Sequence, residues 1–110
     1  MSNLKWFKVY DSIQAAKEVH QAATITKHFI ANRPICMVHS EGVFYAFEDS
    51  CPHQGKSFVG GSCHNGVVEC PVHKYKFVLK PDNGRMALNL FPTKEDEEGV
   101  YVGIKMGFWD

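Results

Sequence analysis

The sequence predicts an all-β protein of antiparallel sheets, with about eight to ten short strands. Short runs rich in apolar, β-branched and aromatic residues favour strands, and Gly, Pro, Asn and Asp interrupt them often, as in the turns of such a protein. No stripe of helical period continues far, so we expect no helix longer than about three turns. A length of 110 residues suits one domain spanning residues 1–110.

The first part of the chain is predicted to hold an edge strand and a short helical segment. Residues 5–10 alternate lysine with aromatic or aliphatic residues, as an exposed edge strand does. Residues 11–23 carry apolar residues at roughly helical spacing, and Asp11 or Ser12 could cap a short helix or turn there. We expect His20 to be a surface side chain on general burial statistics.

A hairpin and a further strand are predicted next. Residues 23–30 and 35–39 are rich in β-formers, and Asn, Arg and Pro at 32–34 indicate the turn between them. Residues 43–48 form an apolar run that predicts another strand. Cys36 lies within a strand pattern, so we expect a buried side chain that behaves as a small hydrophobe.

The second half of the chain shows the same alternation of strands and turns. Asn65-Gly66 indicates a turn, and an acidic solvated turn is expected at residues 94–98. We interpret Cys63 and His64 as turn or surface residues, with Cys63 a candidate reactive thiol. Strands are predicted at residues 67–69, 77–79, 86–91 and 100–105, with a turn at 81–84.

Two short segments offer one thiolate and one imidazole each. They are Cys51-Pro-His53 and Cys70-Pro-Val-His73, separated by the sixteen residues 54–69. A 2Fe–2S cluster needs two protein ligands for each iron, and in one variant two histidines replace two cysteines on one iron. Two loops with one Cys and one His each would meet that requirement.

Two other interpretations of these residues are weighed against the cluster. Zinc also binds Cys2His2 sets, but zinc fingers place both cysteines before both histidines, whereas the order here is Cys-His-Cys-His. A disulfide between Cys51 and Cys70 would leave the matched histidines unexplained, and nothing else in the sequence indicates an oxidising compartment. The spacing therefore favours the iron–sulfur site.

The pattern resembles the cluster-binding motif of the Rieske family, and most closely its small soluble ferredoxins and the Rieske-like small subunits of nitrite reductases. A proline follows each cysteine, Gly55 follows the first histidine by two residues, and Phe77 follows the second histidine by four, as in the family. The resemblance implies that Cys51 and Cys70 hold the inner iron and that His53 and His73 hold the outer iron. It also implies a Rieske-like antiparallel β-sandwich in which a cluster-binding subdomain, about residues 48–77, is inserted.

The chain departs from the respiratory Rieske proteins at several positions. Those proteins carry two further cysteines that form a disulfide beside the cluster, and Lys56 and Val72 stand at those places. Lys74 replaces the glycine that commonly follows the second histidine, and Tyr75 replaces a serine that donates to a bridging sulfur. Fewer hydrogen bonds to sulfur imply a low reduction potential. The resemblance offers Pro92 as a cover for one side of the cluster, with a simple strand end as the alternative.

Composition excludes several classes of function. Twelve basic and twelve acidic side chains cancel, so the chain has no electrostatic footprint for nucleic acid or an anionic membrane. The N-terminal residues lack the apolar stretch of a secretory signal, and no apolar run approaches the length of a membrane span. We expect a cytoplasmic protein that binds neither nucleic acid nor membrane.

The leading functional hypothesis is a one-electron carrier that is not itself an enzyme. The sequence offers no catalytic residues: it has no facial triad for a mononuclear iron, no Gly-rich nucleotide loop and no nucleophile elbow. The resemblance implies that the redox partners are a reductase and a terminal oxygenase. One alternative is the small subunit of a nitrite reductase or a related oxidoreductase, with the large subunit as its partner. The other is a zinc-bound structural interaction module.

Overall fold

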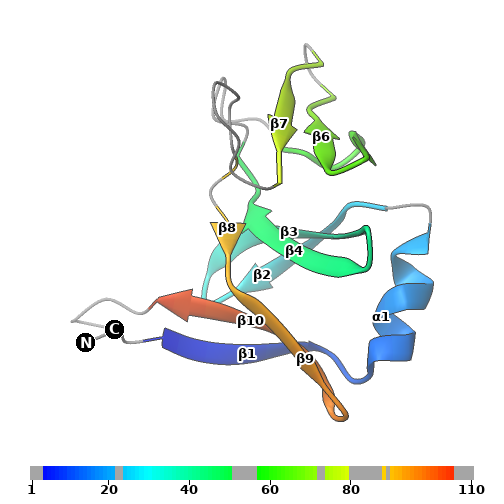
Figure 1. Ribbon diagram of the computed structural model, residues 1–110. Helices are drawn as coiled ribbons and strands as arrows, with labels where there is room; N and C mark the ends of the chain where they lie inside the picture. The colour runs from blue at the N-terminus through cyan, green and yellow to red at the C-terminus, as the bar shows by residue number, and fades with distance from the viewer. Residues whose placement is uncertain are drawn as a thin grey trace.

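The computed structural model of the chain contains three antiparallel sheets and one short helix (Figure 1). It describes residues 4–21, 24–50, 57–71, 74–79, 88 and 90–105. The strand orders are β1-β10-β9, β2-β3-β4-β8 and β5-β6-β7. The predicted all-β class is confirmed. The elements are β1 (Leu4–Tyr10), α1 (Ile13–Val19), β2 (Thr26–Ile30), β3 (Arg33–Ser40), β4 (Val43–Glu48), β5 (Ser62–His64), β6 (Val67–Glu69), β7 (Lys76–Val78), β8 (Leu90–Phe91), β9 (Thr93–Asp96) and β10 (Gly99–Lys105).

β1 forms an edge of the first sheet, as its exposed lysines predicted, and it pairs with β10. α1 follows it directly. The helix begins where the hydroxyl of Ser12 accepts a hydrogen bond from the amide of Ala15 at 3.0 Å, which satisfies one of the free amides of the first turn. It ends where the amide of His20 donates to the carbonyl of Ala16. Ser12 is therefore the cap, and the prediction of a short helix is confirmed.

β2 and β3 form the predicted hairpin, but the turn lies one residue earlier than expected. Ala31 and Asn32 both have positive φ, 52° and 64°, which is typical of a two-residue hairpin turn that matches the twist of its strands. Arg33 and Pro34 belong to β3 and pair with the end of β2. The prediction of a turn at 32–34 was wrong because proline is also tolerated at the start of a strand.

β5, β6 and β7 form a small sheet that lies between β4 and β8 in the chain and stands at one end of the molecule (Figure 1). Asn65 and Gly66 make the turn from β5 to β6, both with positive φ. Cys63 lies in β5 with its side chain buried, while His64 next to it is exposed. The expectation of a turn or surface position for Cys63 was wrong, because alternation along the strand turns its side chain inward.

The middle sheet is buried on both faces. In β3, Ile35 and Met37 pack toward the first sheet, and Cys36 and Val38 pack toward the third, which explains a run that is apolar without alternation. The first core consists of Ala16, Ile30, Ile35, Met37, Phe44, Ala46, Val100, Val102 and Ile104. The second core consists of Ile25, Cys36, Val38, Phe47, Phe58, Cys63, Val68, Cys70, Phe77, Leu79 and Leu88.

The last third of the chain returns to the first two sheets. The acidic segment that was expected to be a turn is mostly strand β9, paired with β10, and only residues 97–98 form the turn. Pro92 joins β8 to β9, and its carbonyl accepts a hydrogen bond from the amide of Gly103 at 2.8 Å. That contact favours the interpretation of Pro92 as a strand end. The predicted turn at 81–84 lies outside the described residues, as do positions 86, 87 and 89 of the predicted strand.

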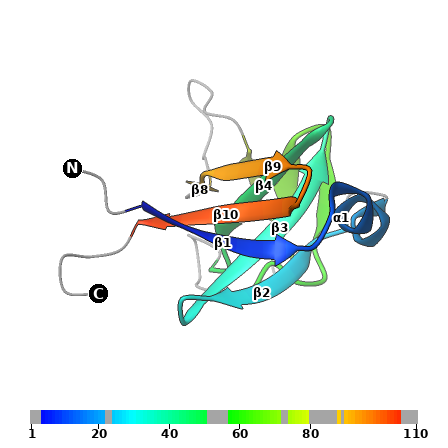
Figure 2. The same ribbon diagram turned by 90° about the horizontal axis from the view of Figure 1, so that it is seen from below.

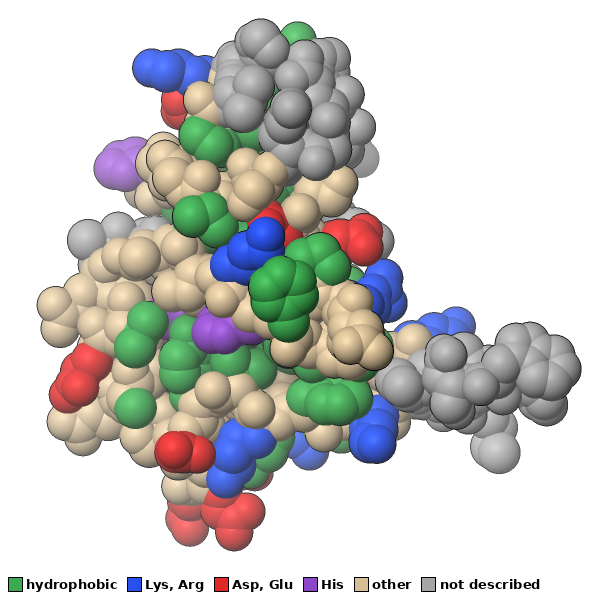
Figure 3. Space-filling view, turned by 180° about the vertical axis from the view of Figure 1, so that it is seen from behind, with side chains coloured by type: hydrophobic (Ala, Val, Ile, Leu, Met, Phe, Trp, Pro, Cys, Tyr) green, Lys and Arg blue, Asp and Glu red, His purple; other side chains and the backbone are tan. Residues whose placement is uncertain are grey.

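The layer of β1, β10 and β9 crosses the layer of β2, β3 and β4, with α1 at one end of both (Figure 2). Acidic and basic side chains are interspersed over the face shown in Figure 3. That face therefore has no broad area of one charge sign, which agrees with the balanced composition. Within the described ranges, no helix has the length and apolar character that crossing a membrane requires.

A polar cluster lies between α1 and the two larger sheets. The prediction that His20 is a surface residue was wrong, since its side chain is 2% exposed. Its Nδ1 donates to the carbonyl of Thr24 at 2.8 Å, so its Nε2 accepts from the hydroxyl of Tyr10 at 2.7 Å. His28 Nε2 lies 3.2 Å from the same hydroxyl and 2.9 Å from the hydroxyl of Thr26. Burial lowers the pKa of both histidines, and the mutual repulsion of their charged forms lowers that of His28 further.

We expect this cluster to make the protein less stable in mild acid. Because His20 and His28 have lowered pKa values when folded, the unfolded chain binds protons below about pH 6.5 that the folded chain does not. The free energy of unfolding should be highest above that pH and fall below it, by up to about 1.4 kcal/mol per pH unit for each histidine. Urea denaturation between pH 8 and pH 5 measures this.

The matched variants are His20→Gln and His64→Gln. His20→Gln should make the free energy of unfolding fall less steeply at acid pH, because only His28 of the two histidines with lowered pKa values is left. His64 is exposed, so His64→Gln should leave the slope of the wild type. Equal slopes for wild type and His20→Gln would contradict the assignment.

Candidate metal centre

The structure describes one of the four predicted cluster ligands. Cys70 directly follows β6, and its side chain is buried. Cys51, His53 and His73 lie outside the described residues, so their approach to Cys70 stays a prediction. Within the described ranges, no three His, Cys, Asp or Glu side chains form a group that could hold a metal ion.

The loop that follows β6 is closed at its base. The amide of Cys70 donates to the carbonyl of Tyr75 at 2.8 Å, and Glu69 pairs with Lys76 where β6 and β7 begin to run together. Lys74 has φ of 57°, the left-handed conformation that glycine adopts most readily. Lys74 thus adopts a backbone conformation that suits glycine, at the position where the family commonly has glycine.

Side-chain hydrogen bonds of Asp49 join the residues before and after the first predicted loop. Asp49, two residues before Cys51, accepts a hydrogen bond from the amide of Phe58 at 2.7 Å and from the hydroxyl of Ser57 at 2.8 Å. Its own amide donates to the carbonyl of Pro34 in β3 at 2.9 Å. The two ends of the stretch that carries Cys51 and His53 are thus tied together and to the middle sheet.

The carboxylate of Asp49 has further partners in β2 and β3. Lys27 Nζ lies 3.1 Å from one oxygen, and the thiol of Cys36 donates to the other at 3.1 Å. Burial by itself raises the pKa of Asp49, but the Phe58 amide, the Cys36 thiol, the Ser57 hydroxyl and the Lys27 ammonium together hold that pKa below its usual range. Asp49 is therefore ionised at neutral pH.

Cys36 and Cys63 are not among the predicted ligands, and both side chains are buried. Burial raises the pKa of Cys36, and its hydrogen bond to Asp49 raises it further. Burial also raises the pKa of Cys63, which argues against the reactive thiol suggested by the sequence. Cys36 is buried as expected, but its hydrogen bond to Asp49 had no signal in the sequence.

Three phenylalanines join the bases of the two loops. Phe58 follows the first predicted loop and Phe77 follows the second, and their rings meet edge to face with centroids 5.9 Å apart. Phe47, at the end of β4, meets Phe58 in the same manner at 5.2 Å. All three side chains are buried. Packing of this kind places the residues before and after each loop at fixed distances from one another.

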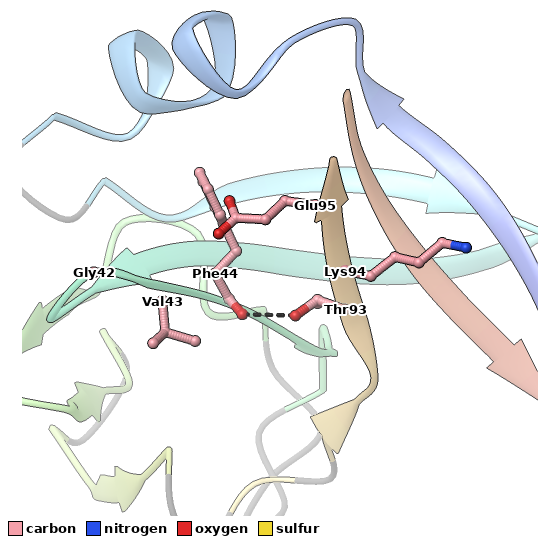
Figure 4. A pocket seen from close by; sticks show the side chains of 6 residues that line it. All are labelled: Gly42, Val43, Phe44, Thr93, Lys94 and Glu95. Atoms are coloured by element: carbon pink, nitrogen blue, oxygen red, sulfur yellow. Dashed lines mark hydrogen bonds between the residues drawn. The ribbon is translucent and has the colours of Figure 1, made fainter. Parts of the chain in front are cut away.

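A pocket of about 140 Å³ lies elsewhere, between β4 and β9 (Figure 4). The hydroxyl of Thr93 donates to the carbonyl of Phe44 at 2.9 Å beside it. The lining residues are Gly42, Val43, Phe44, Thr93, Lys94 and Glu95, none of which is a predicted ligand. This pocket is therefore separate from the candidate metal centre.

The donor set and its support suit a cluster that is held by two loops. Cys70 is buried at the base of one closed hairpin, and the residues flanking the other loop are tied together by hydrogen bonds. Thiolate and imidazole are the ligands of this type of 2Fe–2S centre. The described residues thus fit the predicted cofactor.

Comparisons with known proteins agree. The family model of the Rieske [2Fe-2S] domain matches residues 6–96. The chain is 30% identical over 81 residues to the alkene monooxygenase system ferredoxin component of Xanthobacter autotrophicus, covering 69% of this chain and 66% of that one. It is 28% identical to the biphenyl 2,3-dioxygenase ferredoxin component of Rhodococcus jostii, covering 67% of this chain and 74% of that one.

Solved structures show the same fold. A chain from the complex of reduced oxygenase and oxidized ferredoxin in carbazole 1,9a-dioxygenase matches with a TM-score of 0.70 and 26% identity, over 94% of this chain and 96% of that chain. The terminal oxygenase of carbazole 1,9a-dioxygenase from Nocardioides aromaticivorans matches with a TM-score of 0.76 and 17% identity, over 96% of this chain but 31% of that one. The second match bears on the fold alone.

Proposed function

The chain belongs to the Rieske [2Fe-2S] domain family, and on that premise we propose that it carries single electrons from a reductase to a terminal oxygenase. The family implies a 2Fe–2S cluster, which supplies a site that takes up and releases one electron. Ferredoxin components of oxygenase systems are among the relatives, and they are similar in sequence over most of this chain. The cytoplasmic location stays a prediction from the sequence.

The observation that carries the proposal is the joining of the two loop bases. The Phe47–Phe58–Phe77 contacts and the hydrogen bonds of Asp49 connect the flanks of both predicted loops within one core. A redox centre benefits from such support, because little rearrangement is then needed when its charge changes.

In this proposal the residues have distinct roles. Cys51 and Cys70 hold the inner iron, and His53 and His73 hold the outer iron. Each histidine keeps one ring nitrogen for a hydrogen bond while the other binds iron, so its N–H can meet a partner protein. Residues 1–110 form one Rieske domain, in which residues 48–77 are the cluster-binding subdomain.

In this proposal the catalytic site belongs to the partner proteins and not to this chain. We propose a carrier without a substrate site of its own, whose partners catalyse the oxidation. Exposed residues near the second loop, Lys74 and Tyr75, are candidates for a small and transient docking surface of the kind that redox partners use.

Spectroscopy and electron delivery together test the proposal. Purified protein should be coloured and show the electron paramagnetic resonance signal of a reduced Rieske cluster. A reductase of an aromatic-ring oxygenase system with NADH should bleach it, and adding the terminal oxygenase with substrate should restore the colour. Colourless protein with bound zinc would overturn the cofactor assignment. A cluster that no such reductase reduces would overturn the proposed partners.

We further expect a reduction potential in the lower part of the Rieske range of about −150 to +300 mV. The reason is that Lys56 and Val72 exclude the disulfide of the respiratory proteins and Tyr75 replaces their serine. Tyr75→Ser should raise the potential by supplying a hydroxyl donor to sulfur, whereas Tyr75→Phe should change it less. Voltammetry measures all three, and a wild-type midpoint above about +200 mV would contradict the expectation.

A further inference from the structure

Asp49 places a buried negative charge two positions before the predicted ligand Cys51. Its side chain is 0% exposed, whereas the side chain of Lys27, its ion-pair partner, is 36% exposed. Burying a charge is costly, and a buried ion pair is often no more stable than neutral residues of similar shape. Stability alone therefore does not account for a carboxylate at this position.

The two hydrogen bonds that tie Asp49 to residues 57 and 58 do not require the charge either. The amide of Phe58 and the hydroxyl of Ser57 both donate to Oδ1, at 2.7 and 3.0 Å, and the oxygen of an asparagine side chain could accept both. An asparagine would need no lysine beside it. What aspartate provides at position 49 and asparagine would not is thus the negative charge, which is paired with Lys27.

The carboxylate is also held in one place. Oδ1 accepts from Cys36, Ser57 and Phe58, and Oδ2 accepts from Lys27 and Ser57. The backbone of Asp49 is fixed to β3 through the carbonyl of Pro34. The charge cannot move away from the loop that follows it without breaking several of these contacts.

The short sequence separation limits how far the backbone of Asp49 can lie from that of Cys51, the first predicted ligand. Asp49 lies two positions before Cys51 in the chain, so their Cα atoms are at most about 7 Å apart. A buried charge acts on its surroundings through protein rather than through water, so it is screened weakly. The half-exposed ammonium of Lys27 is screened more.

We infer that Asp49 is a positioning residue that also sets the reduction potential, by fixing the base of the first ligand loop and holding a negative charge beside the cluster, and that Lys27 offsets part of this effect. The inference rests on the proposed function. Negative charge disfavours the addition of an electron, so Asp49 lowers the potential and Lys27 raises it. The pair therefore adjusts how readily the carrier gives up its electron to the oxygenase.

Substitutions with opposite effects on the local charge test the inference, with potentials measured by voltammetry at pH 8. Asp49→Asn should shift the reduction equilibrium at least about three-fold toward the reduced form, and Lys27→Gln should shift it toward the oxidised form. Lys27→Arg keeps the positive charge, so its reduction potential should stay at the wild-type value. The matched control is Glu48→Gln, because Glu48 is also a carboxylate in an ion pair, with Arg33 at 3.4 Å, but its side chain is 36% exposed.

The outcomes distinguish an effect of Asp49 on the reduction potential from a purely structural role of Asp49, and both from a failure of the proposed function. Opposite shifts in Asp49→Asn and Lys27→Gln, each larger than that of Glu48→Gln, support the inference. Shifts of the same sign, or none above the control, overturn it. If Asp49→Asn does not retain the cluster, Lys27→Gln and Lys27→Arg still decide, because both keep the carboxylate. Wild-type protein without a 2Fe–2S signal would instead mean that the proposed function has failed.

Discussion

Replacing Cys51 or Cys70 by serine is expected to abolish the visible absorption and the electron paramagnetic resonance signal of the cluster. Serine offers a hard hydroxyl, which is a poor ligand for an iron–sulfur centre, and each iron would be left with too few protein ligands. The loss should be essentially complete rather than partial. Iron content and the visible spectrum of the purified variants measure it.

The other two cysteines are the matched controls. Cys36→Ser and Cys63→Ser should retain the full signal, because both side chains are buried thiols with raised pKa values. A serine at position 36 can still donate to Asp49. Full-strength spectra in Cys51→Ser or Cys70→Ser would disprove the ligand assignment, as would loss of the cluster in both controls but not in these two.

Phe58→Ala is expected to lower the free energy of unfolding by about 3–5 kcal/mol. Phe58 is 0% exposed and its ring contacts both Phe47 and Phe77, so truncation leaves a cavity where the small sheet joins the middle sheet. Because Phe58 also follows the first ligand loop, the variant should lose its cluster at a lower urea concentration than the wild type. Chemical denaturation followed by fluorescence and by cluster absorbance measures both effects.

The control for this truncation is another phenylalanine. Phe29 is 74% exposed on β2, so Phe29→Ala should change stability by no more than about 0.5 kcal/mol. If Phe58→Ala were as mild as Phe29→Ala, the aromatic contacts would not be what joins the loop bases.

Much of the fold could be predicted from local patterns. The edge strand β1, the turn at Asn65-Gly66 and the cap at Ser12 depend on neighbouring residues alone, and the structure confirms them. The hairpin at 32–34 was misplaced because the local preferences of Arg33 and Pro34 suit both a turn and a strand end. Pairing with β2 decided between them.

The sequence by itself determined the all-β class and the motif that relates the chain to its family, because alternation, turn chemistry and ligand spacing are properties of short segments. Only the tertiary structure decided that His20 lies buried beside Tyr10, that Cys63 points inward and that Asp49 is paired with Lys27. Each of these depends on residues far apart in the chain that packing brings together. Alternation along a strand says that one face turns inward, but which groups are buried or paired there is set by such neighbours.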